Sequence, residues 1–451
     1  MDNKTQLARL GLFDARVPRY TSYPTATHFS TDVGESDTRR WISGLAPGTP
    51  ISIYVHVPFC RRLCWFCACR TQGMGNLDPV RSYLDTLLGE VAMLRDALPQ
   101  GVRIARIHWG GGTPTLMQPD MMERLADALT GLAPYAPDLE FSVEIDPNEI
   151  DDARLDTLAA AGMNRASIGV QDFDPEIQRI IGREQSFEVT AAAVEALRAR
   201  NIHSLNADIL YGLPGQTGQK ITESVQKLLS LSPDRVALYG YAHVPWMARR
   251  QNMIPADLLP TPEERLALFD TARRLFQWDG YREIGIDHFA RPGDGLEIAQ
   301  KTGHLRRNFQ GYVDDKAPVL IGLGASAISR FPGGFAQNAS ATAEYLGKIR
   351  GGAFATKRGH AFHGEDLLRS RLIEALMCDF RIDNAEITAS FGISAEGLKR
   401  LYRVAADTFG DMVAITPTGF EITPDGRPLT RMIARAFDAY EMSAQSHSVA
   451  I

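Results

Sequence analysis

Long hydrophobic runs and an excess of basic residues are both missing from this sequence. Its apolar runs have the length of strands and are broken by charged residues or glycine, whereas a membrane-spanning helix needs about 20 apolar residues. The amino-terminal segment contains no apolar stretch of the kind found in secretory signals. The net charge is −6, and no basic stripe is present that would bind nucleic acid phosphates. We therefore expect a cytoplasmic protein that has no membrane span and does not bind nucleic acid.

Cysteine is scarce and unevenly placed. The chain has five cysteines in 451 residues, and four of them lie between Cys60 and Cys69. A disulfide framework spreads its cysteines along the chain, so this cluster indicates the ligands of a metal centre. The fifth, Cys378, lies in the apolar run RLIEALMCDF and is predicted to be a small buried side chain.

Short β-rich segments alternate with longer amphipathic segments from residue 51 onward. The expected strands span residues 51–57, 106–110, 140–146, 165–170, 205–212 and 235–244. The expected helices span residues 83–98, 121–132, 153–162, 187–200 and 221–231, where apolar residues recur at helical spacing. This alternation predicts an α/β fold with parallel strands, namely a partial (β/α)6 barrel that binds ligands at the carboxyl ends of its strands.

The segments outside the barrel have other compositions. Residues 1–50 form an N-terminal extension whose aromatic residues and prolines predict a lid over the barrel mouth. Residues 51–330 contain the barrel and further strand-like runs, REIGID and VLIGLGASAIS. Residues 331–364 are expected to be a linker. Residues 365–451 are expected to form a mainly helical, winged-helix-like domain with one short β segment.

The cysteines follow the first expected strand with the spacing C-x3-C-x2-C-x-C. Thiolates suit iron–sulfur clusters or zinc. If Cys60, Cys64 and Cys67 bind three irons of a [4Fe–4S] cluster, the fourth iron is open to an outside ligand. A structural zinc site is the alternative, although zinc sites usually have two cysteine pairs separated by a longer loop.

Glycines and polar residues stand where the next strands end. HWGGGTPTL places Gly111, Gly112 and Thr113 at the second strand end, where bare backbone can approach a ligand. Glu144, Gln171, Asp208 and Arg183 lie at or after later strand ends. They could bind ribose hydroxyls or adenine, while each alone is equally consistent with a capping or surface role.

The cysteine spacing, with the aromatic Phe66 before the last cluster cysteine, resembles the radical S-adenosylmethionine (SAM) superfamily. Further motifs follow in order between residue 18 and about residue 330: PRYTSYPTA, YVHVPFC, HWGGGTPT, VEIDP, GVQDF, DILYGLPGQT, YAHVP, DHFARP, NFQGY and GASAIS. Together they resemble the oxygen-independent coproporphyrinogen III oxidase (coproporphyrinogen dehydrogenase) family. Cys69 and PRYTSYPT distinguish this family from the related heme chaperones.

The resemblance implies an enzyme of heme and porphyrin biosynthesis. Coproporphyrinogen III would lose two propionate carboxyl groups by oxidative decarboxylation, giving the two vinyl groups of protoporphyrinogen IX. The family uses a [4Fe–4S] cluster and two bound SAM molecules. A one-electron donor such as flavodoxin or ferredoxin and a monomeric state are further family expectations.

The resemblance also implies roles for individual residues. The cluster ligands would be Cys60, Cys64 and Cys67, and Cys69 would be needed for activity without binding the cluster. The first SAM would contact Tyr54, Gly111, Glu144 and Ile328. The second would contact Phe66, Gly112, Thr113, Gln171, Arg183, Asp208 and Ala242. Trp65 and Ala68 replace the common Tyr and Gly of the motif, and neither change removes a ligand.

Substrate contacts are less defined. Propionates favour guanidinium partners, because arginine binds carboxylates with two hydrogen bonds. Arg19, Arg291 and Gln310, with Tyr312 close to Gln310 in sequence, are the candidates, and ordinary ion pairs are the alternative for the arginines. Three other functions stay open at this point: a heme-binding chaperone, a heme-degrading methyltransferase and a zinc-stabilised barrel.

Overall fold

The computed structural model describes residues 3–441 and residue 450. It confirms the six expected strands, which are β1 (Pro50–Val57), β4 (Arg103–Gly111), β5 (Tyr135–Ile145), β6 (Arg165–Gln171), β7 (Ser204–Tyr211) and β8 (Arg235–Gly240). They pair in chain order and all run parallel. Their carboxyl ends therefore meet at one edge of the curved sheet.

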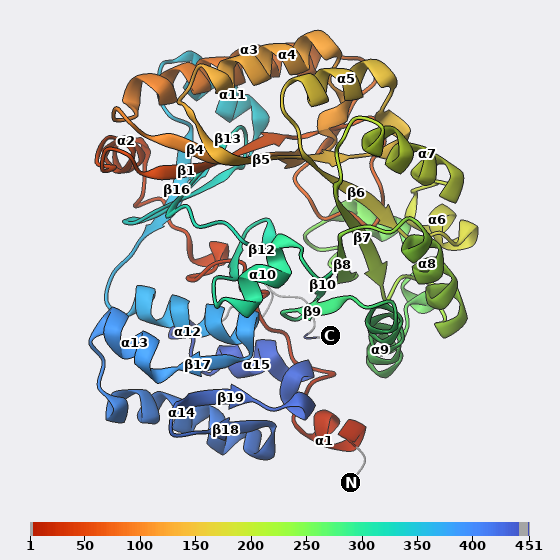
Figure 1. Cartoon of the computed structure of the whole chain (residues 1–451), viewed down its shortest axis with the longest axis vertical. Helices are drawn as coiled ribbons and strands as arrows, with labels where there is room; N and C mark the ends of the chain where they lie inside the picture. The colour runs from red at the N-terminus through yellow and green to blue at the C-terminus, as the bar shows by residue number, and fades with distance from the viewer. Residues whose placement is uncertain (1–2, 442–449, 451) are drawn as a thin grey trace.

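Helices cover the outer face of this sheet (Figure 1). They are α3 (Asp78–Ala97), α4 (Pro119–Thr130), α5 (Asp152–Ala160), α6 (Pro175–Ile181), α7 (Phe187–Arg198) and α8 (Gly218–Ser230). The sequence predicted all but α6, which has only seven residues. Apolar residues on one side of each helix pack on the sheet, as in α8, where Ile221, Val225 and Leu228 are buried.

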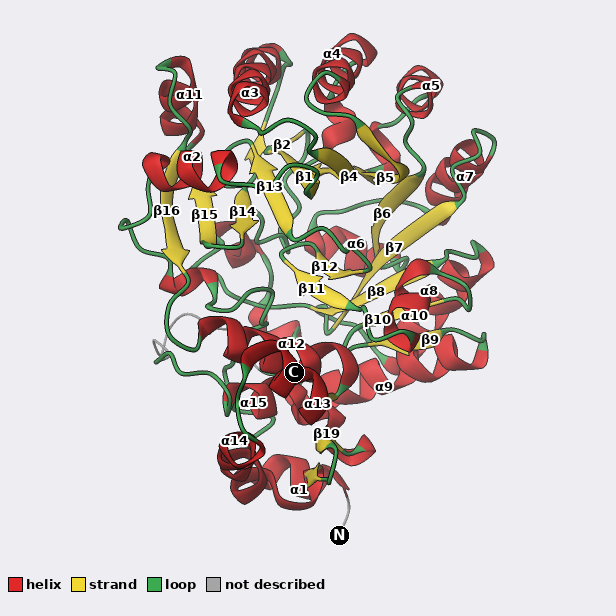
Figure 2. Cartoon of the chain, turned by 60° about the vertical axis from the view of Figure 1, so that its left-hand side comes forward, coloured by secondary structure: helices red, strands yellow, loops and turns green. Residues whose placement is uncertain are grey.

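The sheet extends beyond the barrel to 12 strands (Figure 2). β13 (Val319–Leu323) joins β1 in parallel, and β14 (Ile328–Phe331), β15 (Gly334–Asn338) and β16 (Thr356–Ala361) continue in antiparallel order. On the far side, β10 (His288–Ala290) and β9 (Arg282–Ile284) follow β8. The prediction of a linker over 331–364 is wrong, because this segment supplies the buried strand β15, the edge strand β16 and α11 (Thr342–Arg350).

The C-terminal domain has its own core. Its elements are α12 (Asp366–Asp379), β17 (Arg381–Asp383), α13 (Asn384–Phe391), α14 (Ala395–Phe409), β18 (Val413–Ile415), β19 (Gly419–Ile422) and α15 (Thr430–Arg435). The three short strands form one antiparallel sheet in the order β17-β19-β18, and the element order is that of a winged helix. The end of the predicted domain, 442–449 and 451, lies outside the described residues.

The N-terminal extension packs mainly on the C-terminal domain. Leu7, Leu12, Val17 and Tyr20 belong to that domain's hydrophobic core, and α1 (Asn3–Arg9) lies beside it in Figure 1. The extension then passes between the domain and the carboxyl edge of the barrel, where Arg19 donates to the carbonyl of Gly240 at 3.1 Å. The first two residues of the predicted extension are outside the part of the chain that the structure describes.

The remaining helices and strands lie between the elements described above or flank them. They are α2 (Glu35–Ser43), β2 (Phe59–Cys60), β3 (Gln72–Gly73), α9 (Pro262–Trp278), α10 (Gly295–Lys301), β11 (Arg306–Asn308) and β12 (Gly311–Val313), with the short helices Ala26–His28, Pro114–Leu116, Pro147–Glu149, Arg249–Met253, Ala256–Leu258, Gly410–Met412 and Pro424–Leu429. Cys378 is fully buried, as predicted. Within the described residues, no helix has the length and apolar character that crossing a bilayer requires.

Candidate active site

The first strand ends bring together a cluster of polar side chains. In the β1–β4 pairing Tyr54 stands opposite His108, and their rings stack with centroids 5.8 Å apart. The hydroxyl of Tyr54 lies 3.0 Å from Nδ1 of His56. His108 Nε2 lies 3.3 Å from Oε1 of Glu144 on β5, so side chains from three adjacent strands meet on the inner face.

Glu144 is ionised in this setting. Burial opposes its ionisation, but the hydrogen bonds from His108 and from the Gly111 amide outweigh burial and lower the pKa of Glu144. The Gly111 amide donates to Oε2 at 3.0 Å. The side chain remains 40% exposed toward the interior of the barrel, so a carboxylate is available to a ligand there.

The glycine turn after β4 packs against the segment that leads into the cysteines. The amides of Gly112 and Thr113 donate to the carbonyls of Val57 and Phe59, each at 2.8 Å. A Cβ on Gly112 would stand 2.5 Å from the carbonyl oxygen of Phe59, so only glycine fits. The same turn therefore supports the cysteine loop.

The thiols of Cys60, Cys64 and Cys67 share one loop without forming a compact ligand group. A tetrahedral zinc ion with Zn–S bonds of about 2.3 Å holds its sulfurs about 3.8 Å apart. Among the described residues, these thiols do not form a set of three ligand atoms within 4.8 Å of one another. This arrangement disfavours a single zinc ion bound by the three thiols.

Cys69 forms hydrogen bonds to Cys67 and is not placed as a fourth equivalent ligand. A hydrogen bond from the Cys69 side chain is the main reason that the pKa of Cys67 is lowered, and the same bond raises the pKa of Cys69. The Cys69 amide also donates to the Cys67 sulfur at 3.4 Å. Cys67 is thereby favoured as a thiolate, the form that binds metal.

Arg183 links the cysteine loop to the later strands. Its Nη1 lies 3.7 Å from the Cys64 sulfur and 3.1 Å from Asp146 Oδ2, and its Nη2 donates to the Gly169 carbonyl at 3.0 Å. Its Nε is buried without a hydrogen-bond partner in the described part of the chain. An unpaired buried donor next to the thiols is consistent with a polar ligand bound at this point.

Asp208 and Gln171 stand on the same interior face. Burial raises the pKa of Asp208 to about 7, while a hydrogen bond from Asn206 at 2.8 Å partly opposes the shift. Gln171 has a φ of +72°, an uncommon backbone conformation for a residue other than glycine. Such strain often marks a functional strand end.

Ile328 and Ala242 flank this polar face. The Ile328 backbone packs against Gly322, which stands opposite Tyr54 in the β1–β13 pairing. The Gln251 amide joins Ala242 to the cysteine loop by donating to the Phe66 carbonyl at 2.7 Å and to the Ala242 carbonyl at 3.1 Å. All the predicted cluster and SAM residues therefore lie around one end of the barrel.

Sequence reasoning missed four residues of this site. His56 and His108 alternate with buried residues along their strands, so strand periodicity could have placed them on the inner face. Gln251 joins two loops, and Arg250 donates to Thr71 at 3.0 Å. No local pattern in the sequence indicates either of these contacts.

A cavity of about 420 Å³ opens between the carboxyl ends of β7 and β8, α9, the N-terminal extension and the C-terminal domain. Ala242, Tyr239 and Tyr241 form part of its wall, so it adjoins the predicted SAM residues. Seven arginines and three carboxylates line it. The arginines are Arg16, Arg19, Arg265, Arg273, Arg307, Arg427 and Arg431.

The cavity is therefore electropositive. Arg307 lies 3.8 Å from Asp287, and Arg273 and Arg427 each lie 3.4 Å from Glu283. Burial, followed by the nearby charge of Arg19, lowers the pKa of Arg431. Repulsion among these guanidinium groups indicates a site that anionic groups would stabilise.

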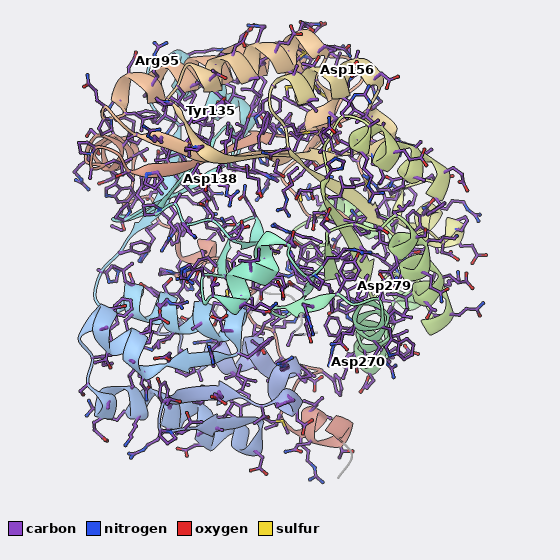
Figure 3. All side chains as sticks on the ribbon, in the orientation of Figure 1. Arg95, Tyr135, Asp138, Asp156, Asp270 and Asp279 are labelled. Carbon is purple, nitrogen blue, oxygen red and sulfur yellow. The ribbon has the colours of Figure 1, made fainter. Side chains whose placement is uncertain are left out.

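The predicted substrate residues Arg19 and Arg291 lie in different parts of the structure. Arg19 lines the cavity, whereas Arg291 does not. Arg291 lies beside Asp279 at the C-terminal end of α9. Asp270, which lines the cavity, lies earlier on the same helix (Figure 3). The Arg291 amide donates to the Asp234 carbonyl before β8 begins, at the opposite edge of the sheet, so its role as a substrate residue stays a prediction that this cavity does not support.

The NFQGY motif forms the β11–β12 hairpin. Its Gly311 lies close to the Tyr239 hydroxyl, but Gln310 is not among the residues that line the cavity. Tyr312 is buried, accepts from the Ile286 amide at 3.0 Å and donates to the Met377 carbonyl. Tyr312 thus holds the hairpin to α12, and its ring centroid lies 4.5 Å from the guanidinium carbon of Arg307, which lines the cavity.

Comparison with known proteins identifies the family of this chain. The family model described as the Radical SAM superfamily matches residues 54–228. An oxygen-independent coproporphyrinogen III oxidase of Paracoccus denitrificans (strain Pd 1222) is 66% identical over 451 residues, which is 100% of both chains. One of Escherichia coli (strain K12) is 38% identical over 439 residues, covering 96% of this chain and 95% of the relative.

A solved structure agrees over the whole fold. The coproporphyrinogen III oxidase of Escherichia coli, described as a radical SAM enzyme, superposes with a TM-score of 0.90 at 36% identity. The match covers 95% of this chain and 100% of that structure. The chain therefore belongs to the oxygen-independent coproporphyrinogen III oxidase family of radical SAM enzymes, a membership that implies a [4Fe–4S] cluster and SAM as its cofactors.

Proposed function

We propose that this enzyme converts coproporphyrinogen III to protoporphyrinogen IX by oxidative decarboxylation of two propionates. The observation that carries the proposal is the arginine-lined cavity, whose wall at Ala242 is joined to the cysteine loop through Gln251. A substrate with four carboxylates requires a site of this charge next to the radical source. The Paracoccus relative, which matches the full length of the chain, is named for this reaction.

Each decarboxylation removes one hydrogen atom, one carbon dioxide and one electron from a propionate, and leaves a vinyl group. When bound, the cluster and SAM supply the one-electron cleavage that gives a 5′-deoxyadenosyl radical to accept the hydrogen atom. The last electron passes to an acceptor outside the chain. The protein must therefore orient the propionate and keep water and other hydrogen donors away.

The residues divide into groups by what they bind. Cys60, Cys64 and Cys67 would bind the cluster, with the Cys69 thiol supporting Cys67 through its hydrogen bond. Tyr54, Gly111, Glu144 and Ile328 would hold the first SAM, whose amino group suits the ionised Glu144. A second SAM would contact Phe66, Gly112, Thr113, Gln171, Arg183, Asp208 and Ala242. Of this second set, Ala242 is also part of the cavity wall.

The cavity combines aromatic surface with its positive charge. Tyr211, Tyr239, Tyr241 and Trp246 contribute aromatic surface, and the arginines come from several sides. We infer that the propionates not under attack bind to these arginines while one propionate is presented to the radical. Arg19 would be one such partner, as its guanidinium reaches the end of β8.

The remaining expectations also belong to this proposal. The enzyme would act as a monomer in the cytoplasm and receive electrons from a flavodoxin or ferredoxin. Arg61, Arg62 and Arg70 on the cysteine loop are compatible with an acidic donor, and Arg61 pairs with Glu149 at 2.9 Å.

An anaerobic assay tests the function directly. The reconstituted enzyme is incubated with SAM, a reductant and coproporphyrinogen III, and the porphyrins are oxidised and separated by chromatography. Protoporphyrin should form with 5′-deoxyadenosine, and Cys64→Ser should abolish both. Cleavage of SAM without protoporphyrin would refute the substrate. Methyl transfer to a porphyrin, or stable heme binding without SAM cleavage, would support the methyltransferase or chaperone functions instead.

A further inference from the structure

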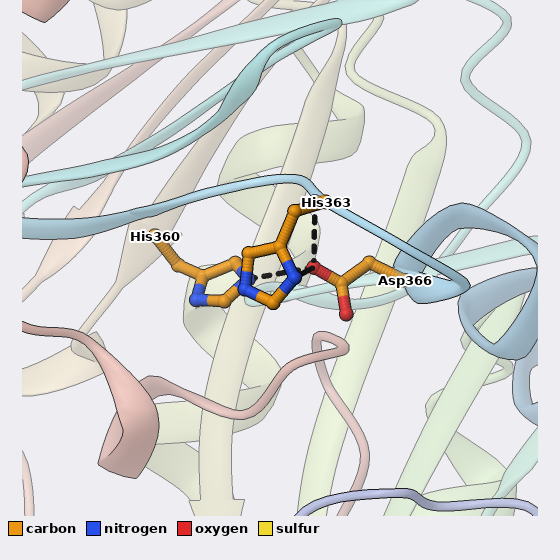
Figure 4. Close-up of side chains that lie close together, drawn as sticks. All are labelled: His360, His363 and Asp366. Carbon is orange, nitrogen blue, oxygen red and sulfur yellow. Dashed lines mark hydrogen bonds and ion pairs between the residues drawn. The ribbon is translucent and has the colours of Figure 1, made fainter.

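A second cluster of metal-binding side chains lies away from the cysteine loop. His360 is on β16, His363 is in the following loop and Asp366 begins α12, so the three span the junction between the barrel and the C-terminal domain (Figure 4). One ligand atom from each lies within 4.8 Å of the other two, and no other trio of His, Cys, Asp or Glu in the described residues meets this condition. None of the three contributes to the site proposed above.

The distances are close to those of a coordinated ion. Nitrogen and oxygen ligands about 2.0–2.1 Å from a tetrahedral zinc ion are about 3.3 Å apart. Here His360 Nε2 is 2.7 Å and His363 Nδ1 is 4.0 Å from Asp366 Oδ2. Side-chain movements of about 1 Å would bring the three atoms to the required spacing, and His363, which is 71% exposed, is free to make the largest movement.

The surroundings orient the ligands. The Tyr440 hydroxyl donates to Asp366 Oδ1 at 2.7 Å, which leaves Oδ2 directed at the histidines. His360 and Asp366 are only 10% and 6% exposed, so packing holds them in place. Hydrogen-bonded carboxylates of this kind support metal ligands in proteins. The open side, at His363, gives an ion a route from solvent.

We propose that His360, His363 and Asp366 bind one divalent transition-metal ion, with zinc as the matching chemistry. Two imidazoles and one carboxylate are a zinc ligand set that leaves a fourth position for water. Magnesium and calcium are disfavoured, because they select oxygen ligands. The ion would join the last strand of the barrel sheet to the first helix of the C-terminal domain.

The same segment is in contact with both ends of the chain. Gly359, next to His360, pairs with Ser30, and Tyr440 also contacts the ring of His28, with centroids 4.9 Å apart. A bound ion would therefore stabilise the junction of four chain segments. Its removal should loosen the packing of the C-terminal domain on the barrel rather than abolish the radical chemistry.

Cobalt(II) is the probe for this site. The cluster-loaded enzyme, kept anaerobic so that iron occupies the cysteine site, is titrated with cobalt, and its visible bands and iron content are followed. One equivalent of cobalt should give bands that zinc removes. His363→Ala should lose them, while His304→Gln, which changes an exposed histidine elsewhere, should retain them. Tyr440→Phe should weaken binding by roughly 10- to 100-fold.

A thermal measurement provides the second readout. Zinc should raise the melting temperature of the wild-type holoenzyme and of His304→Gln, but not that of His363→Ala, because only binding to the folded state stabilises it. Since His363 is exposed, its replacement should leave the fold intact. Equal cobalt bands in the wild type and His363→Ala, or no bands in the wild type, would overturn the assignment.

Discussion

Arg307 allows a quantitative test of carboxylate recognition in the cavity. Its side chain is only 5% exposed, and its Nε and Nη1 have no hydrogen-bond partner in the described part of the chain. The carboxylate of Asp287 is 3.8 Å away, too far for a hydrogen bond. Arg307 therefore has donors available for a propionate, and we expect it to anchor the substrate.

The expected loss of kcat/KM on replacing Arg307 follows from the charge and burial of its contact with the propionate. Hydrogen bonds to charged groups contribute about 1.5–3 kcal/mol, and 1.4 kcal/mol corresponds to a factor of ten. Arg307→Gln should therefore lower kcat/KM for coproporphyrinogen III roughly 10- to 150-fold, mainly by raising KM. Arg307→Lys should lose less, because it keeps the charge but not the planar pair of donors.

The assay compares steady-state rates with SAM binding. Affinity for SAM and the iron content should remain at wild-type values in Arg307→Gln. Arg306→Gln is the matched control, since Arg306 is the adjacent residue of β11, faces the other side of the strand and lies 3.8 Å from Glu374. An unchanged KM in folded Arg307→Gln, or an equal change in Arg306→Gln, would refute the role of Arg307.

Three further predictions concern the cysteine loop, a buried carboxyl and the glycine turn. Cys69→Ala, which removes the side-chain donor, should retain iron and sulfide but raise the pKa of Cys67. Cluster reconstitution, followed by absorbance, should then require a higher pH than in the wild type, and loss of the iron at every pH would contradict this. Burial raises the pKa of Glu90 to about 7, above its unfolded value, so its contribution to stability falls as the pH rises toward 7. In denaturant unfolding, the wild type should lose about 1 kcal/mol of stability between pH 6 and pH 8 relative to Glu90→Gln. Identical pH profiles of the two proteins would exclude this raised pKa. In Gly112→Ala the new Cβ would collide with backbone atoms, which should cost about 1–3 kcal/mol of stability. The same variant should impair SAM binding, measured by equilibrium dialysis. Gly218→Ala, where nothing lies within 4 Å, should behave as the wild type, and an equally mild Gly112→Ala would show that the turn can adapt.

The barrel was predictable because its signals are local. Each parallel strand is a short apolar run, and each covering helix has an apolar stripe, so periodicity gave six strands and five helices within a few residues. The cysteine spacing is equally local. The predicted SAM residues gather at one barrel end because parallel strands bring their carboxyl ends to the same edge.

The strands between residues 331 and 364 are hard to recognise in the sequence because the segment contains several glycines. In the structure, a Cβ on Gly334 would collide with the carbonyl of His360, and one on Gly359 with the carbonyl of Phe335. These glycines permit close strand approach in β15 and β16 rather than a flexible connection. Sequence composition alone does not distinguish these two uses of glycine.

The arginine cavity could not be predicted for a different reason. Its cations come from the N-terminal extension, α9, β11 and the end of the C-terminal domain, which are far apart in the sequence. Each arginine alone resembles an ordinary surface residue. Only the docking of the C-terminal domain onto the barrel brings them together, and periodicity carries no information about that docking.

The pairing of the two chain ends has a consequence for biosynthesis. The Ala450 amide bonds to the Ala15 carbonyl at 2.7 Å, and Arg431 donates to the Ala450 carbonyl at 3.0 Å beside the cavity. During synthesis, the arginine-lined wall can therefore be completed only after the segment around Ala450 has been made, so this cavity forms late in folding.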